Sequence, residues 1–497
     1  MAFIEKLRKL FLSRPFMLLC ALAGAVFVSC GAEVAGAIFF AILISVILVV
    51  CEDIMATTLP FLIVCISVLQ CYDSFNVFIG YIWLAVIPVG AVIFHFIYYR
   101  KKIEIGKTFW GILAVSVAVT LGGIGSISLK EYFGGASLYY IAGLGVGMAI
   151  TYILIKSQMN VDRNYDLHEK LVDIMYIAGM FACFEIIEIY VENFANLHAA
   201  ENFAALHKEG IFCIFEGGEG KNCLSRFFEA RNNIGGWNGA LPGANLSENY
   251  PLGTSMLQPG NNISTFLMLF LPFPFYRAMK GNKNLYHLLA AFLMLGCMFL
   301  SGSRGGMLCG SVEFFICLVA FSLAVKSTAS KIVGWALTGL GIIAAIFIAK
   351  EIQIIDKIKD LFSGEQDRIK LFWRSVEDFK SSPIFGKGIG QKPADFPYGG
   401  KEGTMKWYHM MIPQIIGSMG TVGILAYGYQ IFGRVREIFK KFSPYVMTLG
   451  LSYVGIFLMS QVNPGEFCPL PYQLMVVMLF IMIENEPDRK KGLKNKI

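Results

Sequence analysis

Long apolar stretches alternate with short polar connectors along almost the whole chain. From Phe16 to Ile483 the apolar stretches run for about 17 to 25 residues, enough at 1.5 Å per residue to cross a hydrocarbon core about 30 Å thick. We therefore predict an all-α, polytopic integral membrane protein with about 14 transmembrane helices. The predicted spans are 16–31, 35–50, 58–72, 76–98, 108–127, 136–156, 170–190, 261–279, 284–302, 305–325, 331–349, 410–432, 443–461 and 468–484.

Composition points the same way, because 56% of the residues are hydrophobic and only 15% are charged. Soluble domains carry about a quarter charged residues, so the apolar excess must face lipid. The formal net charge of +7 lies largely in short basic connectors, which suits membrane lipids and topology rather than nucleic acid. We expect membrane lipids as partners and no nucleic acid.

The basic connectors predict the orientation, since Lys and Arg are retained on the cytoplasmic side. An inside N-terminus places the C-terminus inside as well and puts two long segments, 191–260 and 350–409, on the outer face. Both segments contain a predicted amphipathic helix, at 192–210 and 356–380. The predicted regions are 1–190 (N-terminal bundle), 191–260 (first outer loop), 261–349 (central helices), 350–409 (second outer loop) and 410–497 (C-terminal helices and cytoplasmic tail).

Most of the twelve cysteines fall inside apolar spans, where Cys acts as a small packing residue. Cys213 and Cys223 differ because they share the first outer loop, and whether they form a disulfide stays open. No CxxC pair or His/Cys cluster has metal-ligand spacing, so we predict no metal.

Polar residues of three segments lie at predicted outer membrane boundaries. Arg304, in the turn SGSRGG, is costly near lipid unless it faces a cavity or partner, and a snorkelling arginine that caps a hairpin is the equal alternative. Arg368 and Arg374 lie on the amphipathic segment DRIKLFWRS, for which a plain solvated face is the stronger alternative. His409 stands where the second loop re-enters the membrane, and its imidazole can take a proton from a hydroxyl near neutral pH. An interfacial His is more often structural.

Together these motifs resemble the bacterial O-antigen ligase and O-antigen polymerase superfamily of polytopic glycosyltransferases. RGGML at 304–308 is similar to that family's Arg-x-x-x-Leu motif, and His409 followed by Gly420 and Gly423 matches the spacing of its histidine motif. The stretch from Arg368 to Gly390 and the segment PGNNISTFLMLFLP at 259–272 also resemble the family. The resemblance covers roughly residues 257–423 and rests on the order of the motifs rather than on any one of them.

The resemblance implies a reaction at the outer face of the bacterial cytoplasmic membrane. The donor would be a glycan on undecaprenyl diphosphate, and the acceptor a hydroxyl of a glycan, a lipid or another molecule. Arg304 and Arg368 would bind the diphosphate, with Arg374, Glu313, Gly420 and Gly423 as possible supporting residues. His409 would act as general base in an inverting, metal-independent transfer without a cofactor. Glu313 is first of all interpreted as a structural partner.

Other functions remain open. Polymerase and ligase differ only in the acceptor, and we favour a polymerase because the N-terminal half shows nothing suited to an acceptor protein. A transporter or flippase of lipid-linked oligosaccharide also fits many spans, although flippases are usually built from related halves, which are not visible in the sequence. A catalytically silent partner of other membrane enzymes is a third alternative.

Overall fold

The structure is a computed structural model. It describes residues 2–29, 32–54, 57, 86–125, 141–157, 165–199, 260–281, 284–301, 303–351, 367–389, 408, 410–462, 466 and 472–488. The chain divides into two compact units, each assembled from two stretches of sequence. Unit 1 comprises Met1–Lys102 and Gln158–Ile352, and unit 2 comprises Ile103–Ser157 and Gln353–Ile497. Every regular element in the described ranges is helical, which confirms the all-α class.

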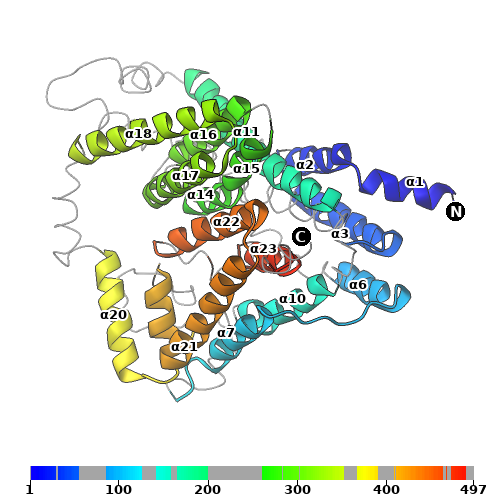
Figure 1. Ribbon diagram of the computed structural model, residues 1–497. Helices are drawn as coiled ribbons and strands as arrows, with labels where there is room; N and C mark the ends of the chain where they lie inside the picture. The colour runs from blue at the N-terminus through cyan, green and yellow to red at the C-terminus, as the bar shows by residue number, and fades with distance from the viewer. Residues whose placement is uncertain are drawn as a thin grey trace, which may run out of the picture. The chain divides into compact units, whose positions relative to one another are not determined.

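Unit 1 contains the N-terminal helices, one long helix and a bundle of central helices (Figure 1). In the bundle, α14 and α16 both pack against α17, and α17 packs along α18. The helices are α1 (Ala2–Phe11), α2 (Arg14–Ser29), α3 (Glu33–Val50), α6 (Val86–Tyr98), α11 (Tyr165–Ala199), α14 (Gly260–Phe270), α15 (Pro272–Lys280), α16 (Asn284–Leu300), α17 (Arg304–Ala324) and α18 (Thr328–Glu351).

Unit 2 is organised around α21, which packs against both α7 and α20. Figure 1 shows α20 in yellow beside the first part of α21 in orange. The buried core between α7 and α21 includes Val119, Met419 and Tyr427, together with Ile389 from the turn after α20. The helices are α7 (Phe109–Leu121), the π-helix η2 (Ile141–Gly147), α10 (Met148–Lys156), α20 (Asp367–Ser381), α21 (Met411–Lys440), α22 (Pro444–Ser460) and α23 (Leu474–Glu484).

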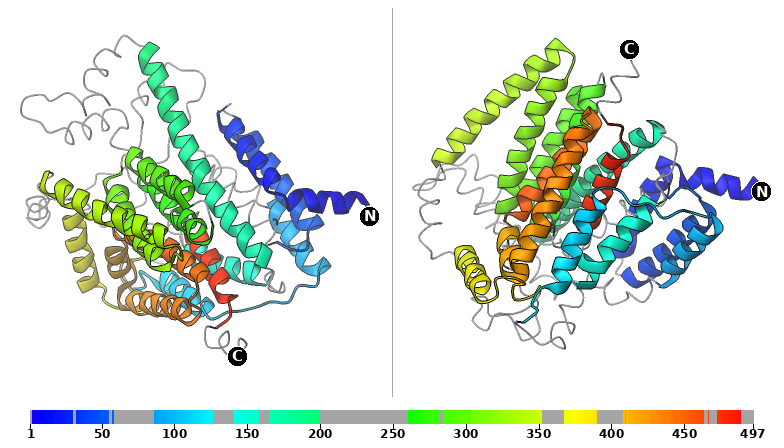
Figure 2. Two further views of the ribbon diagram at one scale, coloured as in Figure 1. Left: turned by 45° about the horizontal axis from the view of Figure 1, so that its top comes forward. Right: turned by 60° about the horizontal axis from the view of Figure 1, so that its bottom comes forward.

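The predicted helices at 170–190 and 192–210 are not separated as expected. Instead α11 runs without interruption from Tyr165 to Ala199, as Figure 2 shows, so the predicted span 170–190 and the start of the predicted surface helix are one element. The prediction placed a boundary near residue 191 because polar residues begin there, but residues 180–199 contain no Gly or Pro that would end a helix.

The structure does not confirm a count of 14 spans. Among the described residues, Gly305–Ala324 and Met411–Lys440 are long and apolar enough to cross a membrane, and other apolar helices are shorter. Interruptions explain part of the difference. The predicted span 261–279 divides into α14 and α15 at Pro272, which lacks an amide N–H, and the span 136–156 has non-helical backbone at Gly145.

The described cysteines behave as predicted for packing residues. Cys20, Cys51, Cys183, Cys297, Cys309 and Cys317 are free thiols and all are buried. Cys213 and Cys223 lie outside the described residues, so their pairing stays an open question.

Candidate functional site

The turn that carries Arg304 is built by serine side chains. Ser303 is the N-cap of α17, and its hydroxyl oxygen accepts a hydrogen bond of 2.8 Å from the amide of Gly306. Such a cap satisfies one of the free amides in the first turn of a helix. Arg304 is therefore the first residue of α17, at an end where the helix dipole favours a nearby anion. Its side chain lies outside what the structure describes.

Helix α14, from the second segment that resembles the family, packs directly on this turn. Ser301 donates to the carbonyl of Met298 at 2.6 Å, so Ser264 of α14 donates to the hydroxyl of Ser301, also at 2.6 Å. A Cβ at Gly306 would lie 2.2 Å from Oγ of Ser264. Helix α14 and the turn before α17, separate in sequence, therefore form one close-packed polar contact in unit 1.

Glu313 lies on the buried face of α17 and is completely inaccessible to solvent. Neither of its carboxylate oxygens has a hydrogen-bond partner among the described residues. The expected structural partner of Glu313 is therefore not found within them. An acidic side chain buried in an apolar helix is unusual enough to keep Glu313 as a candidate, without a role that its contacts define.

Helix α20 carries the other predicted arginines in unit 2. Arg368 is in the first turn of α20, and its side chain lies outside the described residues. Arg374 is partly exposed, with Nη1 3.4 Å from Oε2 of Glu377 and Nε 3.6 Å from Oδ1 of Asp378. Arg374 is thus held by acidic residues of its own helix. The meeting of α20 with Arg304 of unit 1 stays a prediction.

Tyr408 connects α20 to the segment that enters α21. Its hydroxyl donates a hydrogen bond of 2.6 Å to Oδ2 of Asp378, and both side chains are buried. Its ring fills the space beside Gly417, where a Cβ would lie 2.6 Å from the ring. Burial raises the pKa of Tyr408, and the negative charge of Asp378 raises it further. Tyr408 therefore remains a hydrogen-bond donor.

Polar side chains of α21 continue this contact. The amide of Tyr408 donates to Oε1 of Gln414 at 3.1 Å, and Nε2 of Gln414 donates to Oγ of Ser418 at 2.7 Å. Gln414 and Ser418 are both buried. His409, the residue between Tyr408 and α21 in sequence, lies outside the described residues. Its position as a catalytic base is thus not tested.

Helix α21 breaks at Gly420, and the turn after α20 occupies the break. The backbone of Gly420 is non-helical, with φ of 60° and ψ of −149°. In a continuous helix the carbonyls of Gly417 and Ser418 would accept from amides four residues later. Here they accept from the amides of Lys387 and Gly388, at 2.8 and 2.9 Å.

The exchange is reciprocal. The amide of Thr421 donates to the carbonyl of Pro383 at 2.9 Å, and the amide of Val422 donates to the carbonyl of Ile384 at 3.1 Å. Four backbone groups next to the break are therefore satisfied by one turn, as buried backbone requires. We call residues 383–388 and 417–422 the α20–α21 junction.

Glycine is required where the two backbones of the junction meet. A Cβ at Gly420 would lie 2.7 Å from the carbonyl oxygen of Ile384, and one at Gly386 would lie 2.4 Å from the carbonyl carbon of Ser418. Gly423 has a different role, because a Cβ there would lie 2.3 Å from that of Met419 inside the bend. Of the two glycines that the sequence singled out, Gly420 thus has a backbone role in the junction, and Gly423 packs against a side chain just beyond it.

The break also changes the extent of the predicted span 410–432. The part of α21 after the break, Thr421–Lys440, is about 30 Å long by helical rise, which is the thickness of a hydrocarbon core. The part before the break adds only about 13 Å. By length, the part after the break is therefore enough to cross a membrane without the part before it.

Sequence reasoning missed Asp378, Tyr408 and Gln414. A signal was present for the first two, since Asp378 follows Arg374 at helical spacing and Tyr408 precedes His409. Nothing in the sequence shows that residues 30 positions apart would share a hydrogen bond.

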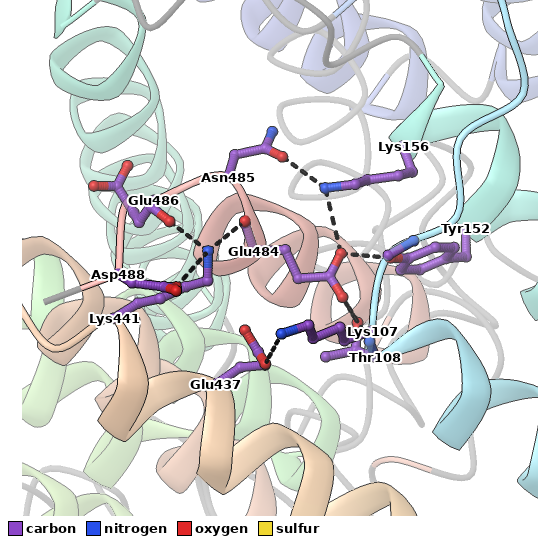
Figure 3. Close-up of polar contacts among 11 residues, drawn as sticks. Lys107, Thr108, Tyr152, Lys156, Glu437, Lys441, Glu484, Asn485, Glu486 and Asp488 are labelled. Carbon is purple, nitrogen blue, oxygen red and sulfur yellow. Dashed lines mark hydrogen bonds and ion pairs between the residues drawn. The ribbon is translucent and has the colours of Figure 1, made fainter. Parts of the chain in front are cut away.

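A second polar region of unit 2 involves the ends of several helices (Figure 3). The carboxylate of Glu484 accepts from the amide and the hydroxyl of Thr108, at 2.5 and 2.8 Å, and from the hydroxyl of Tyr152 at 2.5 Å. Nζ of Lys156 lies 3.4 Å from the same carboxylate. We call Thr108, Tyr152, Lys156 and Glu484 the Glu484 cluster. Its anion stands at the N-terminus of α7, where the helix dipole favours it.

The lysines around the Glu484 cluster are engaged by nearby oxygens. Lys441 donates to the backbone carbonyl of Glu484 at 2.6 Å, and Lys107 lies 3.9 Å from Glu437. Lys441 thereby satisfies a backbone carbonyl at the C-terminal end of α23. In the part of the chain that the structure describes, no group of three or more His, Cys, Asp or Glu residues could hold a metal ion.

A known protein family matches a stretch of the chain that contains the junction but not the Glu484 cluster. Residues 289–428 match the family described as O-antigen ligase. The match confirms the resemblance to the O-antigen ligase superfamily, and its range contains every predicted site residue and the whole junction. No curated protein matches the chain.

Proposed function

We propose, from the O-antigen ligase domain at residues 289–428, that this membrane protein transfers a glycan from undecaprenyl diphosphate to an acceptor hydroxyl at the outer face of the membrane. The observation that carries the proposal is the position of the domain. It begins within α16 and ends within α21, so it includes the Arg304 turn, α20 and the junction.

The chemistry assigns the arginines to the leaving group. A guanidinium keeps its charge and can hold two phosphate oxygens, so Arg304 and Arg368 would bind the diphosphate and stabilise the charge that develops as the anomeric bond breaks. Arg374 is partly exposed on the same helix as Arg368 and would assist. The helix start at Arg304 adds a favourable dipole.

His409 would act as the general base on the acceptor hydroxyl. Its imidazole takes the proton as the hydroxyl oxygen attacks the anomeric carbon, and the diphosphate leaves from the opposite side, which inverts the configuration. The junction supports this assignment indirectly, because it fixes the backbone on either side of the segment that contains His409.

The test is transfer by purified protein in liposomes supplied with a lipid-linked repeat unit, with the product sized on a gel with and without candidate acceptors. We expect R304A and H409A to abolish product while inserting at normal levels. Arg436→Ala, an exposed arginine at the other end of α21, is the matched control and should retain activity. Full activity in both R304A and H409A would refute the mechanism.

The same liposomes separate transfer from transport. A flippase would move the lipid-linked oligosaccharide across the bilayer and leave its size unchanged. A longer glycan identifies a polymerase, and a glycan attached to an added acceptor identifies a ligase.

A further inference from the structure

We propose that Asp378 is a positioning residue for the transfer: its carboxylate fixes Arg374 and the segment containing His409 in one arrangement. The inference rests on the proposed function for the roles of Arg374 and His409. Asp378 itself would touch neither donor nor acceptor.

The position of Asp378 in α20 is the first argument. The inner face of α20 consists of Leu371, Ser375 and Asp378, each at most 3% exposed, whereas Trp373 is 59% exposed. A carboxylate buried in this way is costly unless partners compensate for its lost hydration. Asp378 is therefore expected to stay buried only while its partners hold it.

The two oxygens of Asp378 have different partners. Oδ2 accepts the 2.6 Å hydrogen bond from Tyr408, and Oδ1 lies 3.6 Å from Nε of Arg374. Nε of Arg374 is buried and has no hydrogen-bond partner among the described residues, so the charge of Asp378 is what compensates there for its burial. One carboxylate thus links a residue of α20 with a residue 30 positions later.

Through Tyr408, the hydrogen bond to Asp378 also restrains the segment that contains His409. Its ring is confined beside Gly417, its hydroxyl is bound by Asp378, and its amide donates to Gln414. On the other side of His409, the carbonyl of Met410 accepts a 3.0 Å hydrogen bond from the amide of Gln414. The residues before and after His409 are therefore both held by Gln414.

Such a link matters because the phosphate-binding group and the base must act on one anomeric centre. A misplacement of about 1 Å can lower a rate by about 10²-fold. Tyr408 keeps its proton at neutral pH, because its pKa is raised by burial and by Asp378. Its hydroxyl therefore remains the donor of the 2.6 Å hydrogen bond to Asp378 at neutral pH.

The experiment compares D378N, Y408F and the double variant with the wild-type protein. We expect Y408F to lower kcat about tenfold with little change in the KM for the donor, because only the base segment is loosened. We expect D378N to raise the KM for the donor as well, because Arg374 loses the carboxylate that holds it in place. The double variant should be no worse than about twofold below D378N, since both changes weaken the same link.

The control is Tyr429→Phe, which removes the same hydroxyl from an exposed position on α21 and should behave as wild type. Multiplied losses in the double variant, or single variants that match Y429F, would overturn the proposal. A general loss of folding would instead lower the amount of inserted protein without a split between kcat and KM.

A readout independent of activity separates this inference from the proposed function. Hydrogen exchange of the peptide that contains Tyr408–Gln414 should be faster in Y408F and D378N than in wild type and Y429F. If the wild-type protein transfers no glycan but exchange increases, the proposed function is wrong and the link is real. Unchanged exchange refutes the link whatever the activity.

Discussion

The α20–α21 junction and the Glu484 cluster are both polar regions of unit 2, but different atoms build them. In the junction, four backbone hydrogen bonds join residues 383–388 to 417–422, and the approach requires Gly386 and Gly420. In the Glu484 cluster, one carboxylate gathers an amide, two hydroxyls and a lysine from separate elements. The first region is formed by the main chain, the second by side chains.

From this difference we expect the junction to matter for transfer and the Glu484 cluster to matter for stability. Backbone contacts at a break leave no room for a new side chain, and they set the position of the segments that carry Arg374 and His409. Side-chain contacts at helix ends hold α7, α10 and α23 together but can be replaced by groups with similar hydrogen bonds. Damage to the junction should therefore affect transfer, whereas damage to the Glu484 cluster should affect stability alone.

The largest effect is expected from Gly420→Ala. The alanine would combine a backbone conformation essentially confined to glycine with a contact of 2.7 Å to the carbonyl oxygen of Ile384. Together we expect the free energy of unfolding to fall by about 2–4 kcal/mol and transfer to be lost. Thermal unfolding in detergent and the liposome assay measure the two effects.

Gly428→Ala is the matched control, because Gly428 lies in the same helix and a Cβ there would meet nothing within 4 Å. Alanine is the better helix former, so stability should be unchanged or rise by up to about 1 kcal/mol. If both alanine variants behave alike, the break has no special role.

An intermediate effect is expected from Glu484→Gln. The amide has one acceptor oxygen in place of the carboxylate, so donors among Thr108, Tyr152 and Lys156 are left unsatisfied in a buried place. We expect a loss of about 1–3 kcal/mol in thermal unfolding, with the transfer rate per folded protein unchanged.

Glu5→Gln provides the comparison, since it makes the same change on the exposed helix α1 and should have little effect. A normal unfolding temperature but reduced transfer in E484Q would reverse the proposed division between the two regions.

The smallest effect is expected from Thr421→Val within the junction. The hydroxyl of Thr421 donates to the carbonyl of Pro383 at 2.9 Å, but the amide of the same residue bonds that carbonyl as well. Valine keeps the branched shape and the amide, so we expect a loss of about 0.5–1 kcal/mol and full transfer. A loss as large as that of G420A would show that side chains, and not the backbone, hold the junction.

The helices that could be predicted well are those with uninterrupted apolar stretches. The predicted spans 284–302, 305–325 and 443–461 agree within a few residues with α16, α17 and α22. Their pattern is local, since the residues that end each helix lie in the same stretch of sequence. Interruptions at Pro272 and Gly145 were also present in the sequence but were not used to divide the spans.

The sequence by itself determined an all-α chain rich in apolar helices and the motifs that lie within the residues matching the O-antigen ligase family. Only the tertiary structure decided what Gly386 and Gly420 are for, and that Asp378 binds Tyr408. The physical reason is that these are contacts between residues about 30 positions apart. Apolar periodicity predicts which face of a helix is buried. A backbone carbonyl left free by a break is chemically the same in every residue, so the sequence does not show which donor will bind it.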